Sequence, residues 1–196
     1  MTFRLGLTGS IGMGKSTTAK LFAEAGCPVW DADAAVHRLY ARRGAAVAPM
    51  QAAFPDAVHD GAVSRDALKA ILAKTPEALA RIERIVHPLV ARDRAQFLRE
   101  TEADIVVLDI PLLYETRGEK HMNAVVVVTA PEEVQRARVL ERGTMTEAQL
   151  DAILAKQMPD AEKRSLADYV ITTDTVEHAR AQVQDILAAI RESRHA

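Results

Sequence analysis

Gly9-Ser10-Ile11-Gly12-Met13-Gly14-Lys15-Ser16 is the stretch that decides the fold of this chain. It matches G-x-x-x-x-G-K-[ST], the phosphate-binding loop of nucleotide-binding proteins. Its glycines let the backbone approach a ligand closely and turn successive N–H groups toward an anion. Lys15 supplies a positive charge for the β- and γ-phosphates, and Ser16 supplies a hydroxyl for Mg²⁺. The stretch therefore predicts nucleotide binding, with a glycine-rich turn that only joins a strand to a helix as the simpler alternative.

The segments on either side of the loop support the nucleotide-binding interpretation. Residues 3–8 form a short apolar run that is typical of a buried strand, and residues 16–25 predict a helix. The positive N-terminal end of such a helix favours bound phosphate. We expect the ATP contacts of this region to be made by Gly12, Met13, Gly14, Lys15, Ser16 and Thr17.

Composition sets the outer bounds of the interpretation. The 196 residues, 48% of them apolar and 27% charged, fit one globular domain of ordinary size. A net charge of −2 without a basic block does not favour nucleic-acid binding, and no apolar run is long enough for a membrane span. The single cysteine, Cys27, and a start without a signal peptide favour the reducing cytoplasm. The oligomeric state stays open, with a monomer as the simplest expectation.

Strands alternate with helices along most of the chain. Apolar runs predict further strands at 27–30, 105–109, 124–129 and 169–172, and a final helix at 176–191. The alternation predicts an α/β protein of the P-loop NTPase-type three-layer fold, with a five-stranded parallel sheet.

The predicted core is interrupted by a long helical segment. Between residues 44 and 100 the strand signal disappears, and helices are expected at 65–73, capped by Ser64, and from Thr75-Pro76 onward, with a break or kink at His87-Pro88. We therefore expect one domain over 1–196, with a core of about 1–40 and 103–196 and a helical substrate-binding insertion of about 41–102.

Three carboxylates follow predicted strands. Asp31 and Asp33 come after the second strand and Asp109 ends the third. Ligands of open α/β sheets sit beyond the carboxyl ends of the strands, so Asp33 is a candidate general base and Asp109 a candidate magnesium ligand with Ser16. The alternatives are that Asp33 only caps the helix at 34–42 and that Asp31 is a solvated loop carboxylate.

Other candidates surround the predicted site. Arg65 and His87 could line the insertion, unless they are a surface arginine and a helix-terminal histidine. Pro111, Leu112 and Leu113 place apolar side chains after the third strand, where a substrate base could rest or where the loop simply packs.

The region after the fourth strand indicates a lid. Thr129-x-x-Glu132 and Thr146-x-x-Gln149 are capping boxes that open two helices. Arg138 and Arg142 lie four residues apart on the first of them and therefore share a face. We expect a helical lid over about 142–165 whose arginines neutralise phosphate charge, although a solvated charged face is the alternative reading.

Taken together, the motifs resemble the dephospho-CoA kinase family over about residues 3–173. The resemblance is carried by Leu7–Ser16, Asp31-Ala32-Asp33, Ile85-Val86-His87-Pro88-Leu89, Asp109-Ile110-Pro111-Leu112-Leu113-Tyr114-Glu115, Arg138, Arg142, Gln157 and Ala167–Ile171. The chain departs from the family pattern at Met13, where Ser is frequent, at Ser64 before Arg65, where an acid is common, and at Thr172-Thr173, where an Asn near the adenine is frequent.

The resemblance implies ATP-dependent phosphorylation of the ribose 3′-hydroxyl of dephospho-CoA. It implies that ATP and Mg²⁺ are required, that Asp33, Lys15 and Arg142 are catalytic, and that the helical insertion holds the CoA part. Implied substrate contacts are Thr8, Asp33, Arg65, His87, Pro111, Leu112, Leu113 and Glu115. Rival interpretations are a shikimate- or gluconate-type kinase and a regulatory nucleotide-binding module without catalysis.

Overall fold

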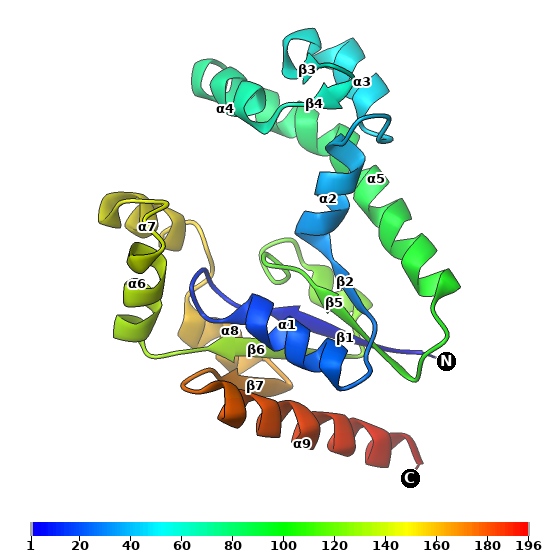
Figure 1. The fold of residues 1–196 in the computed structure, drawn as a ribbon, viewed down its shortest axis with the longest axis vertical. Coiled ribbons are helices and arrows are strands. Elements are labelled where there is room, and N and C mark those ends of the chain that lie inside the picture. Colours follow the sequence, from blue (N-terminus) through cyan, green and yellow to red (C-terminus); the bar gives the residue numbers. More distant parts are fainter. Residues whose placement is uncertain (1, 196) are drawn as a thin grey trace. The chain divides into compact units, whose positions relative to one another are not determined.

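The computed structural model describes residues 2–195 (Figure 1), with the side chain of residue 195 left aside. Within these residues, the main sheet has five strands in the order β2-β5-β1-β6-β7. The strands are β1 (Phe3–Thr8), β2 (Val29–Asp31), β5 (Ile105–Asp109), β6 (Ala124–Thr129) and β7 (Tyr169–Thr172). β1 pairs in parallel with β5 and β6, and β6 pairs in parallel with β7. The predicted α/β fold with a five-stranded parallel sheet is confirmed.

Contacts divide the chain into two compact units. The first runs up to Val29 and resumes at Glu102, and the second spans Trp30–Thr101. Residues 30–40, expected with the core, thus group with the helical segment. A substrate-binding role for this segment stays a prediction.

Helices cover both faces of the first unit's sheet. α1 (Lys15–Glu24) and α9 (Val176–His195) pack on one face, where alternate strand residues such as Leu5 and Leu7 are fully buried against them (Figure 1). The opposite face is covered by the segment after β5 and by residues flanking α8 (Asp160–Leu166), in a cluster around Leu113 and Val127. The period of two along each strand explains this division, and the result is a three-layer arrangement.

The second unit has a core of its own. It contains α2 (Ala32–Tyr40), α3 (Val47–Ala53), a short 3₁₀ turn η1 (Pro55–Ala57), α4 (Arg65–Lys74) and α5 (Ala78–Glu100). Buried Met50, Leu68, Ile82 and Val86 lie in one apolar cluster. β3 (Val58–His59) pairs antiparallel with β4 (Ala62–Val63). The sequence analysis missed these strands because two residues are too few to show a period.

The continuity of α5 and the cap of α2 differ from the prediction. α5 continues unbroken through His87-Pro88, because its apolar stripe packs into the core on both sides of the proline and tolerates one missing backbone hydrogen bond. Residue 31, not Asp33, caps α2: the Asp31 carboxylate accepts the N–H of Ala34 at 2.9 Å, and Asp33 lies in the first turn.

The remaining helices lie between β5 and α8, and the last of them falls within the predicted lid segment of 142–165. They are η2 (Gly118–His121) before β6, and then α6 (Glu132–Glu141) and α7 (Glu147–Leu154). Thr146 and Gln149 form the predicted capping box of α7. The capping box predicted at Thr129 is wrong, because the Thr129 hydroxyl donates to Asp160 instead and α6 begins at Glu132, with Pro131 as an N-cap residue that makes no side-chain hydrogen bond. Among the described residues, no helix has the length and apolar character to span a bilayer.

Candidate active site

The phosphate loop joins β1 to α1 in a conformation that needs glycine. Gly12 and Gly14 have φ angles of 80° and 92°, in the left-handed region. Gly14 is the N-cap residue of α1 and makes no side-chain cap, so backbone N–H groups of the first turn are not covered by a capping side chain. An N-terminal turn of this kind attracts anions through its N–H groups and the helix dipole.

Neighbouring elements hold the loop in this shape. Thr173, buried just after β7, donates its hydroxyl to the carbonyl of Met13 at 2.7 Å. The Met13 side chain is itself buried, with its sulfur 3.1 Å from the backbone N of Ala130. Because the Met13 side chain is buried, only its backbone can contact a phosphate. The methionine that stands where Ser is frequent in the family therefore packs in the interior.

Replacing Gly12 by Ala is expected to lower the unfolding free energy by more than the strain of a left-handed alanine alone would. A Cβ on Gly12 would lie 2.5 Å from Val139 Cγ2 and 2.9 Å from the carbonyl oxygen of Gln135. Gly26→Ala is the matched control, since Gly26 has φ 88° and nothing within 4 Å of its Cβ. We expect Gly26→Ala to cost about 1 kcal/mol of unfolding free energy and Gly12→Ala at least about 2 kcal/mol.

Thermal unfolding and calorimetric ATP titration of the two variants test this. Only Gly12→Ala should also weaken ATP binding. Equal unfolding temperatures, with ATP affinity unchanged in both, would show that the packing around Gly12 is unimportant.

Lys15 is held at the start of α1 by the end of β5. Its ammonium group forms an ion pair with Asp109, whose side chain is only 2% exposed. Asp109 lies opposite Leu7 in the β1–β5 register, which brings the carboxyl ends of both strands to the loop. The motif lysine and the acid that ends the third predicted strand are therefore neighbours.

The residues near Lys15 suit a magnesium ion bound together with nucleotide. Among residues 2–195, no three His, Cys, Asp or Glu side chains cluster as a metal site. Mg²⁺ often takes few protein oxygens and fills its shell with water and substrate phosphates. The Ser16 hydroxyl and the Asp109 carboxylate are hard oxygen donors of that kind, so the chemistry of the predicted pair fits.

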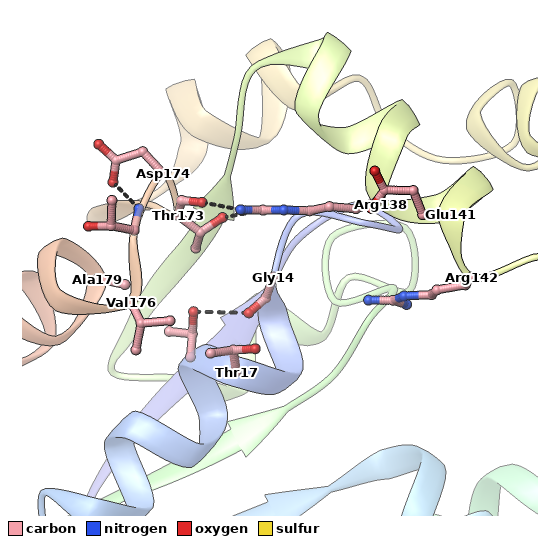
Figure 2. Close-up of a pocket in the computed structure, with 11 residues that line it drawn as sticks. Gly14, Thr17, Arg138, Glu141, Arg142, Thr173, Asp174, Val176 and Ala179 are labelled. Carbon is pink, nitrogen blue, oxygen red and sulfur yellow. Dashed lines mark hydrogen bonds between the residues drawn. The ribbon is translucent and has the colours of Figure 1, made fainter.

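A cavity of about 440 Å³ opens beside the loop, between α1, α6 and the segment that follows β7. Figure 2 shows Arg138 reaching from α6 toward Thr173, with Arg142 one turn further along near Glu141. Arg138 donates to the Thr173 hydroxyl at 2.9 Å and also to its carbonyl. Gly14, the N-cap residue of α1, and Thr17, in its first turn, line the same cavity (Figure 2). The structure thus brings the predicted ATP-binding arginines and the phosphate loop together around one cavity.

The segment after β5 contributes fewer exposed groups than expected. Thr8 is fully buried and donates its hydroxyl to the carbonyl of Pro111 at 3.0 Å, and Leu113 is fully buried in the core. Both side chains are inaccessible in this structure, and a contact of either with substrate stays a prediction. Leu112, at 43% exposure, is the accessible apolar residue of the run. Glu115 pairs with Lys163 of α8.

The second unit carries Asp31, which ends β2, and Asp33, which lies in the first turn of α2. Asp31 and Asp33 are both exposed. Trp30, immediately before them, is buried and donates its indole N–H to Asp93 of α5 at 2.7 Å. Arg38 of α2 donates to the same carboxylate at 2.6 Å. Asp93 therefore ties the start of α2 to α5 and fixes the backbone on which Asp33 sits.

Asp93→Asn is expected to weaken this unit in a pH-dependent way. Burial alone would raise the pKa of Asp93, but hydrogen bonds from Arg38 and Trp30 and the Arg38 charge hold it below the usual 3.8. A depressed pKa stabilises the fold above about pH 3.8 and loses its effect as pH falls through the lower folded-state pKa. Because the carboxylate is partly solvated, we expect a loss of about 1 kcal/mol at pH 7.

Urea unfolding followed by the fluorescence of Trp30, the one tryptophan of the sequence, measures this loss. The gap between wild type and Asp93→Asn should shrink as pH falls below 3.8. A gap that is the same at pH 7 and at the acid limit would contradict the role of the carboxylate charge.

The other substrate candidates of the second unit are exposed. Arg65 is the first residue of α4, directly after the Ser64 cap. Burial raises the pKa of Tyr40 above its usual value, and the positive charge of Arg65 offsets part of that rise. His87 is exposed in the middle of α5. Both are free to contact a ligand of this unit.

Sequence reasoning missed several side chains that shape the site. They are Gln135, Thr173, Lys163 and Asp93, which act through contacts distant in sequence. A buried polar residue on a helix carries no local signal of its partner. In the structure Gln135 lies on the buried face of α6 with Val139, four residues further on, and this spacing is the one sequence signal that could have pointed to it.

Comparison with known proteins decides the family. The family model described as dephospho-CoA kinase matches residues 3–178. The chain belongs to the dephospho-CoA kinase family. It is 68% identical to a dephospho-CoA kinase of Ruegeria pomeroyi, over 97% of both chains, and 62% identical to that of Cereibacter sphaeroides, over 99% of this chain and 98% of the other.

Solved structures agree with the family assignment. A crystal structure from Thermus thermophilus has a TM-score of 0.86 and 34% identity, covering 96% of this chain and 97% of the other. A dephospho-CoA kinase from Campylobacter jejuni has a TM-score of 0.73 at 23% identity, covering 99% of this chain and all of the other, and shares the fold. The predicted family is confirmed, and members of the dephospho-CoA kinase family are phosphotransferases that use ATP.

Proposed function

We propose that this chain transfers the γ-phosphoryl group of ATP to the ribose 3′-hydroxyl of dephospho-CoA, giving CoA and ADP. The observation that carries the proposal is the phosphate loop with its paired Lys15 and Asp109, beside a cavity lined by Arg138 and Arg142, in a dephospho-CoA kinase family chain. Phosphoryl transfer depends mainly on positioning and on stabilising spread negative charge, which these groups suit.

The nucleotide is assigned to the first unit. Backbone N–H groups of residues 12–17 and the Lys15 ammonium group hold the β- and γ-phosphates, and the sugar and base occupy the cavity beside Thr173. Arg142, with Arg138, neutralises charge on the transferring group. Ser16 and Asp109 would hold Mg²⁺, which on binding neutralises phosphate charge.

The acceptor is assigned to the candidate residues that the sequence motifs supply. Asp33 accepts or orients the proton of the 3′-hydroxyl, as an exposed carboxylate after a strand can do. Arg65 and His87 are proposed contacts for the CoA part, and Pro111 and Leu112 offer apolar surface to a base. The segment 142–165 is proposed to close as a lid over the reacting groups.

A coupled ADP-release assay tests the proposal. ATP and Mg²⁺ are supplied with dephospho-CoA, shikimate or gluconate in turn, and the magnesium arm is repeated with chelator. We expect turnover with dephospho-CoA alone and its loss on chelation. Turnover with shikimate or gluconate would favour another small-metabolite kinase, and ATP binding without turnover would favour a regulatory module.

Location and assembly complete the proposal. We assign the enzyme to the cytoplasm as a monomer, in keeping with a single cysteine whose thiol stays unpaired and buried. Burial also raises the pKa of the Cys27 thiol above the usual 9.0, which keeps it protonated and unreactive. Size-exclusion chromatography with light scattering checks the monomer.

A further inference from the structure

Lys163 of α8 is a fully buried lysine that the proposed reaction does not use. Its ammonium nitrogen lies 2.9 Å from Oε1 of Glu115, in the segment after β5. Burying a charge is costly unless it is paired, and a buried ion pair adds little stability compared with apolar side chains of the same size. The pair therefore calls for an explanation other than stability.

Glu115 uses the same oxygen to fix the chain between α7 and α8. Its Oε1 accepts the backbone N–H of Met158 at 2.9 Å. Burial alone would raise the pKa of Glu115, but the neighbouring Lys163 ammonium group and the hydrogen bond from the Met158 N–H hold it below the usual 4.5. The carboxylate therefore stays charged while it accepts the hydrogen bond from the backbone N–H of Met158.

The residue before Met158 reaches the phosphate loop. Oε1 of Gln157 accepts the backbone N–H of Ile11 at 3.3 Å. The carbonyl of Ile11 in turn accepts a hydrogen bond from Nε2 of buried Gln135 at 2.7 Å. Both glutamines line a cavity of about 630 Å³ next to Ser10 and Met13. The backbone of Ile11 is held from α6 and from the α7–α8 connection together.

We propose that Glu115 is a positioning residue for the phosphate loop. Its ion pair with Lys163 and its bond to Met158 set the α7–α8 connection, which places Gln157 against Ile11. Glu115 acts on ATP through this chain of contacts and does not touch dephospho-CoA. The inference rests on the proposed function, in which the loop holds the phosphates of ATP.

A thermodynamic cycle tests the connection. The first variant, Glu115→Gln with Lys163→Met, removes both charges at nearly constant volume. The second, Gln157→Met, removes the acceptor for the Ile11 N–H. The third combines all three changes. Each full-length variant is measured for ATP affinity by calorimetry without acceptor, and for kcat and both KM values.

We expect the first and second variants each to weaken ATP binding about fivefold to tenfold. The third should bind ATP no more weakly than the weaker-binding of these two, because the effects of groups that act through one chain of contacts are not additive. KM for dephospho-CoA should stay within about twofold. A combined loss equal to the product of the single losses would overturn the inference, as would a rise in KM for dephospho-CoA with ATP affinity unchanged.

Two controls keep the outcomes separate. Glu147→Gln makes the same chemical change on an exposed carboxylate of α7, 2.7 Å from Arg136, and should leave ATP affinity within about twofold. If the charge-free pair fails to fold, Gln157→Met still decides, since unchanged ATP affinity in that variant would overturn the inference. Wild type that binds ATP but does not phosphorylate dephospho-CoA would sink the proposed function, while the ATP-binding cycle would still report on Glu115.

Discussion

Lys15→Met is expected to lower kcat by about a thousandfold. The Lys15 ammonium group is the positively charged side chain of the motif, and it can stabilise the negative charge that develops on the γ-phosphoryl group in the transition state. Removing one such preorganised group lowers the rate by about 10²–10³. The same change also removes the charge that pairs with Asp109, a carboxylate with 2% of its side chain exposed. We therefore expect the largest single loss in the molecule at this position.

The measurement is steady-state turnover with dephospho-CoA, next to thermal unfolding. Lys20→Met is the matched control, because Lys20 is an exposed lysine on the same helix and has no role in the proposed site. Lys20→Met should keep kcat within about twofold. A Lys15→Met enzyme that retains its fold and works within tenfold of wild type would contradict the role given to the phosphate loop.

Asp33→Asn is expected to lower turnover by at least about a hundredfold while ATP still binds. The asparagine keeps the size and the exposed position of the side chain but cannot accept a proton. Asp33 does not cap α2, since Asp31 does, so its loss should cost the helix only the favourable charge of a first-turn acid, about 0.3–1 kcal/mol. A catalytic role and a helix-stabilising role are thereby separable.

Calorimetric ATP binding, unfolding temperature and kcat are read on the same preparations. Asp66→Asn serves as control, because Asp66 is likewise an exposed acid in the first turn of a helix of the second unit. It should reproduce any small loss of stability without the loss of turnover. Near wild-type turnover in Asp33→Asn would refute the assignment of Asp33 as base.

Local signals were enough to predict most of the sheet. The strands Ile105–Asp109, Ala124–Thr129 and Tyr169–Thr172 have the predicted bounds. The first two are fully buried and apolar up to a polar last residue, as buried parallel strands require, and the third is an edge strand that is only partly buried. The phosphate loop could equally be predicted from the sequence, because the left-handed backbone at Gly12 and Gly14 requires glycine at these positions.

Competition between partners limited the rest of the prediction. The Thr129 hydroxyl suits a capping box locally, yet it bonds Asp160, more than thirty residues away in the sequence. Pro88 is unfavourable within a helix, yet packing on both sides of it outweighs the local penalty. In each case a tertiary contact, which has no local signature, overrides the local preference.

The same limit applies to the site. The motif placed Glu115 among the expected substrate contacts, but its observed partners are Lys163 and Met158, which no spacing rule connects to it. Asp93 likewise sits in a helix with no visible link to Trp30, although it fixes the backbone beside Asp33. Sequence analysis found the groups with motif chemistry, and the structure adds those that hold them in place.

The most direct test of the central claim is to locate the phosphate in the product. The enzyme is incubated with ATP, Mg²⁺ and either dephospho-CoA or its 3′-deoxy analogue, and the products are analysed by mass spectrometry. The account predicts one added phosphate on dephospho-CoA, a product that co-elutes with CoA, and none on the 3′-deoxy analogue. Phosphorylation of the analogue, or no added phosphate on dephospho-CoA while ATP still binds, would contradict it.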